Sequence, residues 1–195
     1  MKIKSFGLII ILFSVKTACA QLNGETEIGS NETGESFASQ YVNYDFVRTN
    51  VLTRYFWVNR TLERGEFAVG PTFKLNEDTT LKFQFGGTTD REIMLAGTLA
   101  TKIAGHDVLY IVDSKISTTG TANTLYEKVF IAMSPKGELQ TRAEHLLVGS
   151  ESAFLRLGIE GQIKLSTHAQ IFFAPFYDPL DINRSFGGQI GFRFF

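Results

Sequence analysis

The chain has 195 residues, of which 44% are hydrophobic, 20% are charged and 13% are aromatic. This composition suits one packed domain and excludes a wholly disordered chain. The 19 Lys and Arg residues nearly balance the 20 Asp and Glu residues, so no basic surplus points to a nucleic-acid partner. The single cysteine, Cys19, excludes an internal disulfide framework and any metal centre that needs several cysteine ligands.

Residues 1–20, MKIKSFGLIIILFSVKTACA, have the layout of a secretory signal peptide. A basic start with Lys2 and Lys4 precedes an apolar stretch, and small residues surround Cys19. The apolar stretch is too short to cross a bilayer as a helix. We therefore expect export with cleavage after Ala20, which removes the only cysteine.

Residues 21–40 contain several glutamates and no basic residue, and Gly, Asn, Ser and Thr make up most of the remainder. Such a segment has too little apolar surface to fold alone. We predict a flexible acidic N-terminal segment at 21–40, followed by a single folded domain at 41–195.

From Tyr41 onward, apolar and polar residues alternate with a period of two. In FLRLGIEGQIKL, residues 154–165, one parity holds Leu and Ile while the other holds charged residues and Gln. This alternation is typical of strands with one apolar and one polar face. The pattern predicts about ten strands, with approximate spans 46–59, 65–75, 79–87, 91–104, 107–117, 124–134, 138–149, 152–165, 168–177 and 185–195. Residues 93–104 and 138–148 also fit a helical stripe, so a helix stays open for each.

The connections between these segments alternate in character. Short turns are predicted at 76–78, 105–107, 135–137 and 166–168, and longer or more polar loops at 60–65, 86–91, 117–124, 149–152 and 178–184. Short turns at one end and longer loops at the other are the pattern of up-and-down outer-membrane barrels.

The last segment, SFGGQIGFRFF, ends the chain in Phe195. With the signal peptide, the cysteine-free mature chain and the alternating loops, this segment makes the chain resemble small bacterial outer-membrane β-barrels. The resemblance implies an all-β fold, an up-and-down antiparallel transmembrane β-barrel of about 8–10 strands. It also implies a Gram-negative outer membrane, with lipid, lipopolysaccharide and the barrel-assembly machinery as partners.

If the apolar parity faces lipid, the polar parity faces the lumen. The predicted lumen-facing charges are Arg48, Arg54, Glu66, Lys74, Lys82, Glu92, Lys102, Asp113, Lys115, Arg142, Glu144, Arg156, Glu160, Lys164 and Arg193. The surplus of bases among them favours an anion-preferring pore, whereas the small size of the barrel favours a lumen plugged by paired charges. Both interpretations stay open, with the plug preferred.

The sequence contains none of the common catalytic, phosphate-binding or metal-binding motifs. We therefore predict no catalytic residue, cofactor or metal, and a structural or narrow small-solute passage role. One alternative is a soluble periplasmic or secreted barrel or sandwich that binds a ligand inside, with its apolar parity buried. Another is an outer-membrane lipid-modifying enzyme. That enzyme would need a His, an acid and a hydroxyl at the long-loop end, where Ser150 and Ser152 lie but where no His is expected.

Overall fold

The computed structural model describes residues 21–31, 36–46, 48–58, 61–134, 138–180 and 186–195, so the predicted signal peptide at 1–20 lies outside it. Among these residues no helix is long and apolar enough to cross a membrane. The described chain forms strands β1 (Gln21–Asn31), β2 (Ser36–Asp45), β3 (Thr49–Val58), β4 (Thr61–Lys74), β5 (Thr80–Thr88), β6 (Glu92–Ile103), β7 (His106–Ser117), β8 (Thr124–Ala132), β9 (Leu139–Val148), β10 (Glu151–Ser166), β11 (Ala169–Tyr177) and β12 (Phe186–Phe194).

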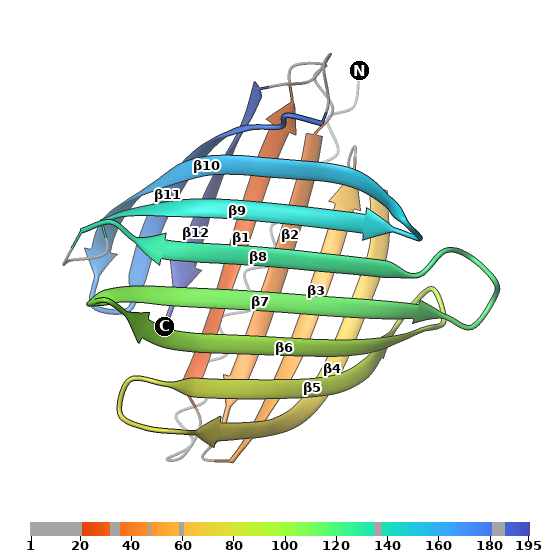
Figure 1. The fold of residues 1–195 in the computed structure, drawn as a ribbon, viewed down its shortest axis with the longest axis horizontal. Coiled ribbons are helices and arrows are strands. Elements are labelled where there is room, and N and C mark those ends of the chain that lie inside the picture. Colours follow the sequence, from red (N-terminus) through yellow and green to blue (C-terminus); the bar gives the residue numbers. More distant parts are fainter. Residues whose placement is uncertain (1–20, 32–35, 47, 59–60, 135–137, 181–185) are drawn as a thin grey trace, which may run out of the picture.

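The strands form a closed antiparallel barrel in which every strand pairs with its neighbours in the chain (Figure 1). The first and last strands complete the ring, with Gly24 opposite Phe194 and Asn31 opposite Gly187. Closure leaves no unpaired strand edge. The predicted all-β, up-and-down barrel is confirmed, but it has twelve described strands where about ten were expected.

The extra strands come from the acidic segment at 21–40, which is not a flexible tail. It forms β1 and the first half of β2. In β1, Ile28 points outward and is 56% exposed, whereas Glu25 and Glu27 are buried inside the barrel. The inward positions of β1 carry acidic residues, so the segment lacks the apolar pattern by which strands are predicted. Basic partners elsewhere in the chain stabilise it.

The ten strands expected from the alternation correspond in order to β3–β12. The two segments with a possible helical stripe are both strands, β6 and β9, because each is held between two neighbouring strands. One predicted short turn is a two-residue hairpin, in which Ala104 and Gly105 have φ of 50° and 83°. Two successive positive φ angles match the turn type whose twist suits antiparallel strands.

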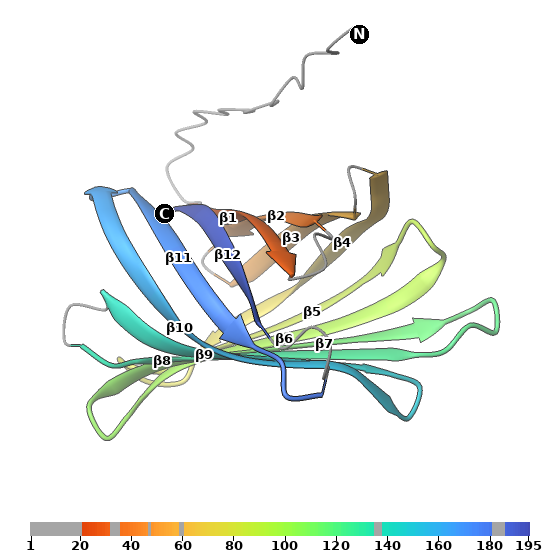
Figure 2. The ribbon, with the colours of Figure 1, turned by 90° about the horizontal axis from the view of Figure 1, so that it is seen from above.

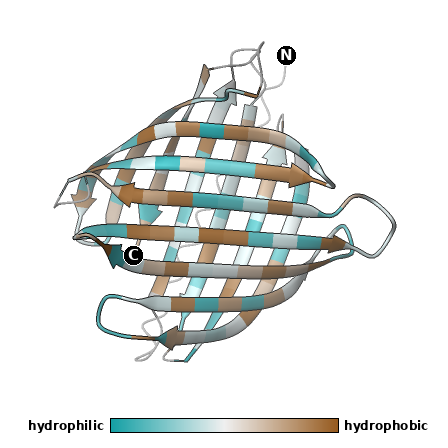
Figure 3. Ribbon diagram, viewed as in Figure 1, coloured by the Kyte–Doolittle hydropathy of each residue, from teal (hydrophilic) through white to brown (hydrophobic). Residues whose placement is uncertain are grey.

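Hydrophobic and hydrophilic residues alternate along many of the strands (Figure 3), and the exposed outward positions are largely apolar. Large hydrophobic side chains that are at least half exposed include Ile28, Phe67, Leu75, Phe83, Phe85, Ile103, Ile163, Leu165, Phe173, Phe186 and Ile190. The alternate positions point inward and carry most of the buried charges. This arrangement is the inverse of a soluble protein, which keeps its charges in water.

The barrel wall consists of two parts that cross one another. Strands β6–β10 run across one side, and β1–β4 run behind them at a steep angle (Figure 1). Seen from above, the strands β1–β3 face the strands β6–β9 across the interior (Figure 2). Long side chains from the two sides can therefore meet in the middle.

The two sides join at β4 and β5, where the backbones approach so closely that only glycine fits. A Cβ atom on Gly86 would overlap the carbonyl oxygen of Phe67 and lie 2.5 Å from the Cα of Ala68. We expect Gly86→Ala to destabilise the barrel by about 1–3 kcal/mol, because backbone atoms of a paired strand have little freedom to move away.

The matched control for this prediction is Gly161→Ala. Gly161 also lies within a strand, but no heavy atom lies within 4 Å of its added Cβ. We expect it to change stability by no more than about 0.5 kcal/mol. Urea unfolding of both variants in phospholipid vesicles measures the difference, and equal stability of the two would contradict the close approach at Gly86.

Candidate functional site in the barrel lumen

Charged side chains on the inward parity fill the middle of the barrel. Within the described part of the chain, the ion-paired ones are eight bases, Arg54, Arg64, Lys82, Lys115, Lys128, Arg142, Arg156 and Arg193, and eight acids, Glu25, Glu27, Asp45, Glu66, Glu92, Asp113, Glu144 and Glu160. The two signs balance among these groups. The surplus of bases that favoured an anion-preferring pore is thus absent from this set.

One cluster joins β3 and β4 to β7, and we call Arg54, Glu66, Asp113 and Lys115 the β3–β7 cluster. Arg54 pairs with Asp113, and its Nη1 atom lies 3.2 Å from Oε2 of Glu66. Lys115 Nζ lies 2.9 Å from Oε1 of the same carboxylate. The strands β3 and β7 are not neighbours in the barrel, so the pairs span the interior. Leu52, Ala68, Met94 and Ala96 form a small apolar group on the same inward faces.

A second and larger cluster joins β1 to the opposite side, and we call it the β1–β9 cluster: Glu25, Glu27, Lys128, Arg142, Glu144, Glu160 and Arg193. Arg142 Nη2 lies 2.8 Å from Oε2 of Glu27, across the lumen. Lys128 Nζ lies 3.6 Å from carboxylate oxygens of both Glu25 and Glu27. The acidic strand β1 is thereby tied to β8 and β9.

Glu160 is the most heavily bonded member of the β1–β9 cluster. Its side chain has no exposed surface, and it accepts hydrogen bonds from Arg142 at 3.1 Å and from Arg193 at 2.9 Å. The amides of Gln140 and Gln162 donate to it at 2.8 and 2.9 Å. A buried carboxylate persists as a charge only when such donors replace its water shell.

Aromatic rings occupy the space beside these charges. The Arg156 guanidinium lies 4.2 Å from the ring centre of Phe154, 4.8 Å from that of Phe176 and 4.9 Å from that of Phe37. The Arg193 guanidinium lies 4.2 Å from the ring centre of Phe172. Cations at these distances from ring faces are stabilised by the ring quadrupole. Rings and cations together fill most of this layer of the lumen.

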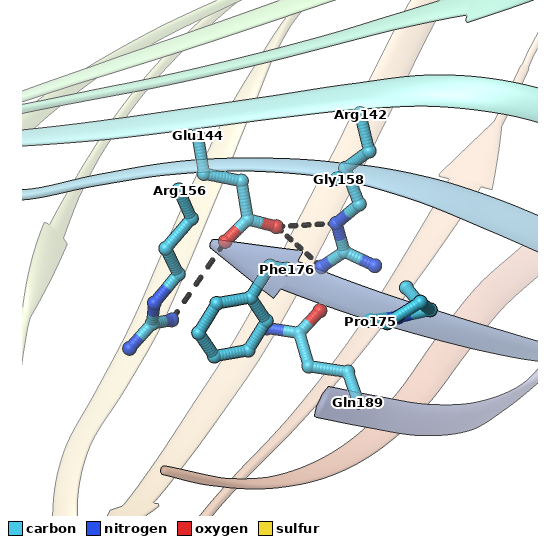
Figure 4. Close-up of a pocket in the computed structure, with 8 residues that line it drawn as sticks. Arg142, Glu144, Arg156, Gly158, Pro175, Phe176 and Gln189 are labelled. Carbon is cyan, nitrogen blue, oxygen red and sulfur yellow. Dashed lines mark hydrogen bonds and ion pairs between the residues drawn. The ribbon is translucent and has the colours of Figure 1, made fainter. Parts of the chain in front are cut away.

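The cavity next to Arg156 shows how completely the layer is filled. Arg142, Glu144 and Arg156 converge on it, with Phe176 and Gln189 on its other side (Figure 4). Its volume is about 10 Å³, the lower limit for holding one water molecule. This part of the lumen therefore has no room for a solute.

The structure divides the fifteen charges that were predicted to face the lumen into two groups. Eleven point inward and belong to the paired network: Arg54, Glu66, Lys82, Glu92, Asp113, Lys115, Arg142, Glu144, Arg156, Glu160 and Arg193. The other four, Arg48, Lys74, Lys102 and Lys164, are exposed. They lie at or beyond strand ends, where both parities of a strand meet solvent. Lys102, for example, is 51% exposed and pairs with Asp78 at 3.3 Å.

Among the acids of the network, the prediction missed Glu25, Glu27 and Asp45. These glutamates lie two residues apart on a segment without an apolar stripe, which hid the strand. The sequence did contain one signal, because an excess of bases on the inward parity requires acids from some other segment. No group of three or more His, Cys, Asp or Glu side chains suited to a metal ion occurs in the ranges described.

Solved structures with the same fold are outer-membrane porins and channels. The KdgM porin matches with a TM-score of 0.64 and 8% identity over 89% of this chain and 98% of the porin. The NanC porin matches with a TM-score of 0.62 and 9% identity over 90% of this chain and 100% of the porin. Omp33 of Acinetobacter baumannii matches with a TM-score of 0.53 and 10% identity over 90% and 98% of the two chains.

At such low identities these likenesses show a shared fold, a closed small barrel of the outer-membrane type. No protein-family model matches the sequence. No curated protein matches it either.

Proposed function

We propose that the protein resides in an outer membrane, with its outward parity in contact with lipid. The observation that carries the proposal is the inverted distribution of side chains. Phe83, Phe85 and Phe173 are 51%, 60% and 58% exposed on the outer wall, while Glu160 and Asp113 have no exposed surface inside. A soluble monomer rarely exposes so continuous an apolar surface. The soluble ligand-binding alternative requires the opposite parity to be buried.

Within that membrane we propose a structural or narrow small-solute passage role for the lumen, which needs no catalysis. The two cross-lumen clusters support this role, because they tie opposite sides of the wall together and leave little space between the paired side chains. The shared fold with porins is compatible with such a passage. Outer-membrane lipid, lipopolysaccharide and the barrel-assembly machinery are the partners that this location requires.

Charged substitutions on the outer wall test the membrane location. Phe173 lies in the middle of β11 on the outward face. We expect Phe173→Arg to destabilise the protein by about 2–4 kcal/mol in vesicles, because the charge would enter the hydrocarbon region. The measurement is urea unfolding in phospholipid vesicles, combined with recovery of the folded protein in the outer-membrane fraction.

Leu75→Arg is the matched control for this substitution. Leu75 is 61% exposed and follows the end of β4, where the bilayer meets water. We expect the control to cost no more than about 1 kcal/mol. Equal tolerance of both arginines, or recovery of the wild-type protein in the soluble fraction, would refute the membrane location.

A further inference from the structure

A chain of four polar side chains lies on the outer wall of the barrel, outside the lumen network. The Nε2 atom of His145 lies 3.0 Å from the hydroxyl oxygen of Ser152. The Nδ1 atom of the same ring lies 3.5 Å from Oε2 of Glu127. The hydroxyl of Tyr110 donates to the other oxygen of Glu127 at 2.5 Å.

This group lies near the long-loop end, where the sequence offered no histidine. His145 is near the end of β9, and Ser152 is at the start of β10, just past the turn that joins these strands. Glu127 lies directly opposite His145 on β8. Strand pairing therefore brings together a hydroxyl, an imidazole and a carboxylate, the combination that a lipid-modifying enzyme would require.

The parity of the strands places the group on the lipid side of the wall. Glu144 and Lys128, which are adjacent in sequence to His145 and Glu127, point into the lumen and are buried. The side chains of His145 and Glu127 are 28% and 35% exposed. On the same outward parity, Leu147 lies opposite both Leu125 and Ser152. The hydroxyl is thus accessible and has apolar neighbours.

The two nitrogens of His145 have different partners, and this division suits nucleophilic catalysis. The carboxylate 3.5 Å from Nδ1 favours the tautomer that carries its proton there, which leaves Nε2 able to accept a proton. The hydroxyl on the Nε2 side is then placed to lose its proton to the ring. Tyr110 fixes the carboxylate by binding the oxygen that does not face the ring.

The backbone next to Ser152 has a further feature of acyl-transfer sites. The β9–β10 ladder shifts register between Ser152 and Phe154, so Ala153 has no partner among the paired residues of that ladder. Such bulges redirect side chains and leave backbone groups without their usual ladder bond. The amide of the residue after a nucleophilic serine is a common donor to the developing oxyanion.

We propose that Ser152 and His145 are catalytic residues of an acyl-ester hydrolysis site, and that Glu127 and Tyr110 are positioning residues. The Ser152 oxygen attacks the ester carbonyl carbon while His145 Nε2 takes the hydroxyl proton. The bond to the alcohol oxygen then breaks, and the alcohol leaves with that proton. Water attacks the acyl-serine in the same way, which releases the carboxylic acid and returns a proton to Ser152.

The substrate class that fits this position is the acyl ester of a membrane lipid. This assignment rests on the proposed membrane location, because only a site in contact with lipid meets such esters at the wall. The catalytic group itself does not involve the lumen. Opening or closing the lumen would therefore leave the esterase activity unchanged. The proposed role of the lumen and the proposed catalytic site can thus be tested separately.

A fluorophosphonate probe, which reacts covalently with activated serines, gives the direct test. The mature full-length chain in detergent micelles is treated with the probe, and the modified peptide is identified by mass spectrometry. We expect modification at Ser152, its loss in Ser152→Ala and in His145→Ala, and full labelling in Ser150→Ala. Ser150 is the matched control because it is a second exposed serine in the same turn region.

The second readout is release of fatty acid from phosphatidylethanolamine in mixed micelles. We expect Ser152→Ala and His145→Ala to lower the rate at least about 1,000-fold, as for other residues that act as a catalytic unit. Glu127→Ala should lower kcat at least about 10-fold with little change in KM. Glu127→Asp, which keeps the carboxylate, should have a kcat between those of Glu127→Ala and the wild type. A merely structural role for Glu127 would not separate kcat from KM.

Each variant is first checked for a folded barrel by its altered gel mobility without boiling. Absence of probe modification in the folded wild-type protein would overturn the catalytic assignment. Modification at Ser152 without fatty-acid release would overturn the lipid substrate. Equal activity of Ser152→Ala and Ser150→Ala would likewise refute the role of Ser152.

Discussion

Replacing Glu160 with alanine is expected to destabilise the barrel by about 3–5 kcal/mol, the cost of leaving buried charges without their partner. Glu160 is fully buried and accepts hydrogen bonds from Arg142, Arg193 and two glutamines. Its removal leaves the buried guanidinium groups of Arg142 and Arg193 without one of their negative partners. The loss of stability should exceed the cost of removing one buried methylene group, because charged partners lose their hydrogen bonds as well.

One further variant separates the charge of Glu160 from its volume, and a second compares the buried network with an exposed ion pair. Glu160→Gln keeps the shape and removes the charge, so we expect it to retain most of the destabilisation. Asp78→Ala breaks the exposed pair with Lys102, where both side chains are more than half exposed. Exposed pairs of this kind contribute about 0–1 kcal/mol.

The measurement is urea unfolding in phospholipid vesicles, followed by the fluorescence of the single tryptophan, Trp57, and by gel mobility without boiling. Stability of Glu160→Ala equal to that of Asp78→Ala would show that the buried network contributes little. Such a result would contradict the view that the paired charges hold the two sides of the lumen together.

The period-two pattern was sufficient to predict the barrel because most strands have an apolar outward face and a polar inward face. Residues 154–165 show this contrast clearly, and β10 lies where it was expected. The strand at 21–31 could not be found in the same way. Its inward face is made of glutamates, and its value to the fold comes from Arg142, Lys128 and Arg193, which are distant in sequence.

The candidate sites differ in how far the sequence could predict them. Parity alone identified the inward position of eleven charges, but it gave no information on which of them pair across the lumen. Pairing such as that of Arg54 with Asp113 depends on the way the two sides of the barrel cross. The contact between His145 and Ser152 depends on strand register and on a bulge, neither of which can be derived from alternation.

Removing one cross-lumen pair should open the barrel. We expect the double variant Glu27→Ala with Arg142→Ala to raise the single-channel conductance by roughly an order of magnitude, since a small barrel conducts only where its interior is not filled by side chains. These two residues meet at 2.8 Å between β1 and β9. The wild-type protein should show little or no conductance in planar bilayers.

The matched control is the double variant Asp78→Ala with Lys102→Ala. It also removes one acid and one base, but from the exposed rim of the barrel. We expect its conductance to equal that of the wild type, because its side chains do not lie across the lumen. Equal conductance of the two double variants, or a large conductance of the wild type, would contradict the view that paired side chains fill the lumen.

The single variants add a test based on charge. Arg142→Ala leaves the acids of the β1–β9 cluster in excess, so any current through it should favour cations. With Arg156, which pairs with Glu144 at 3.8 Å, this layer of the lumen holds four acids and four bases. Glu27→Ala therefore leaves the bases in excess, and its current should favour anions. The double variant restores the balance and should favour neither. Reversal potentials in a salt gradient measure these preferences, and they should change sign between the two single variants only if the ions pass through this cluster.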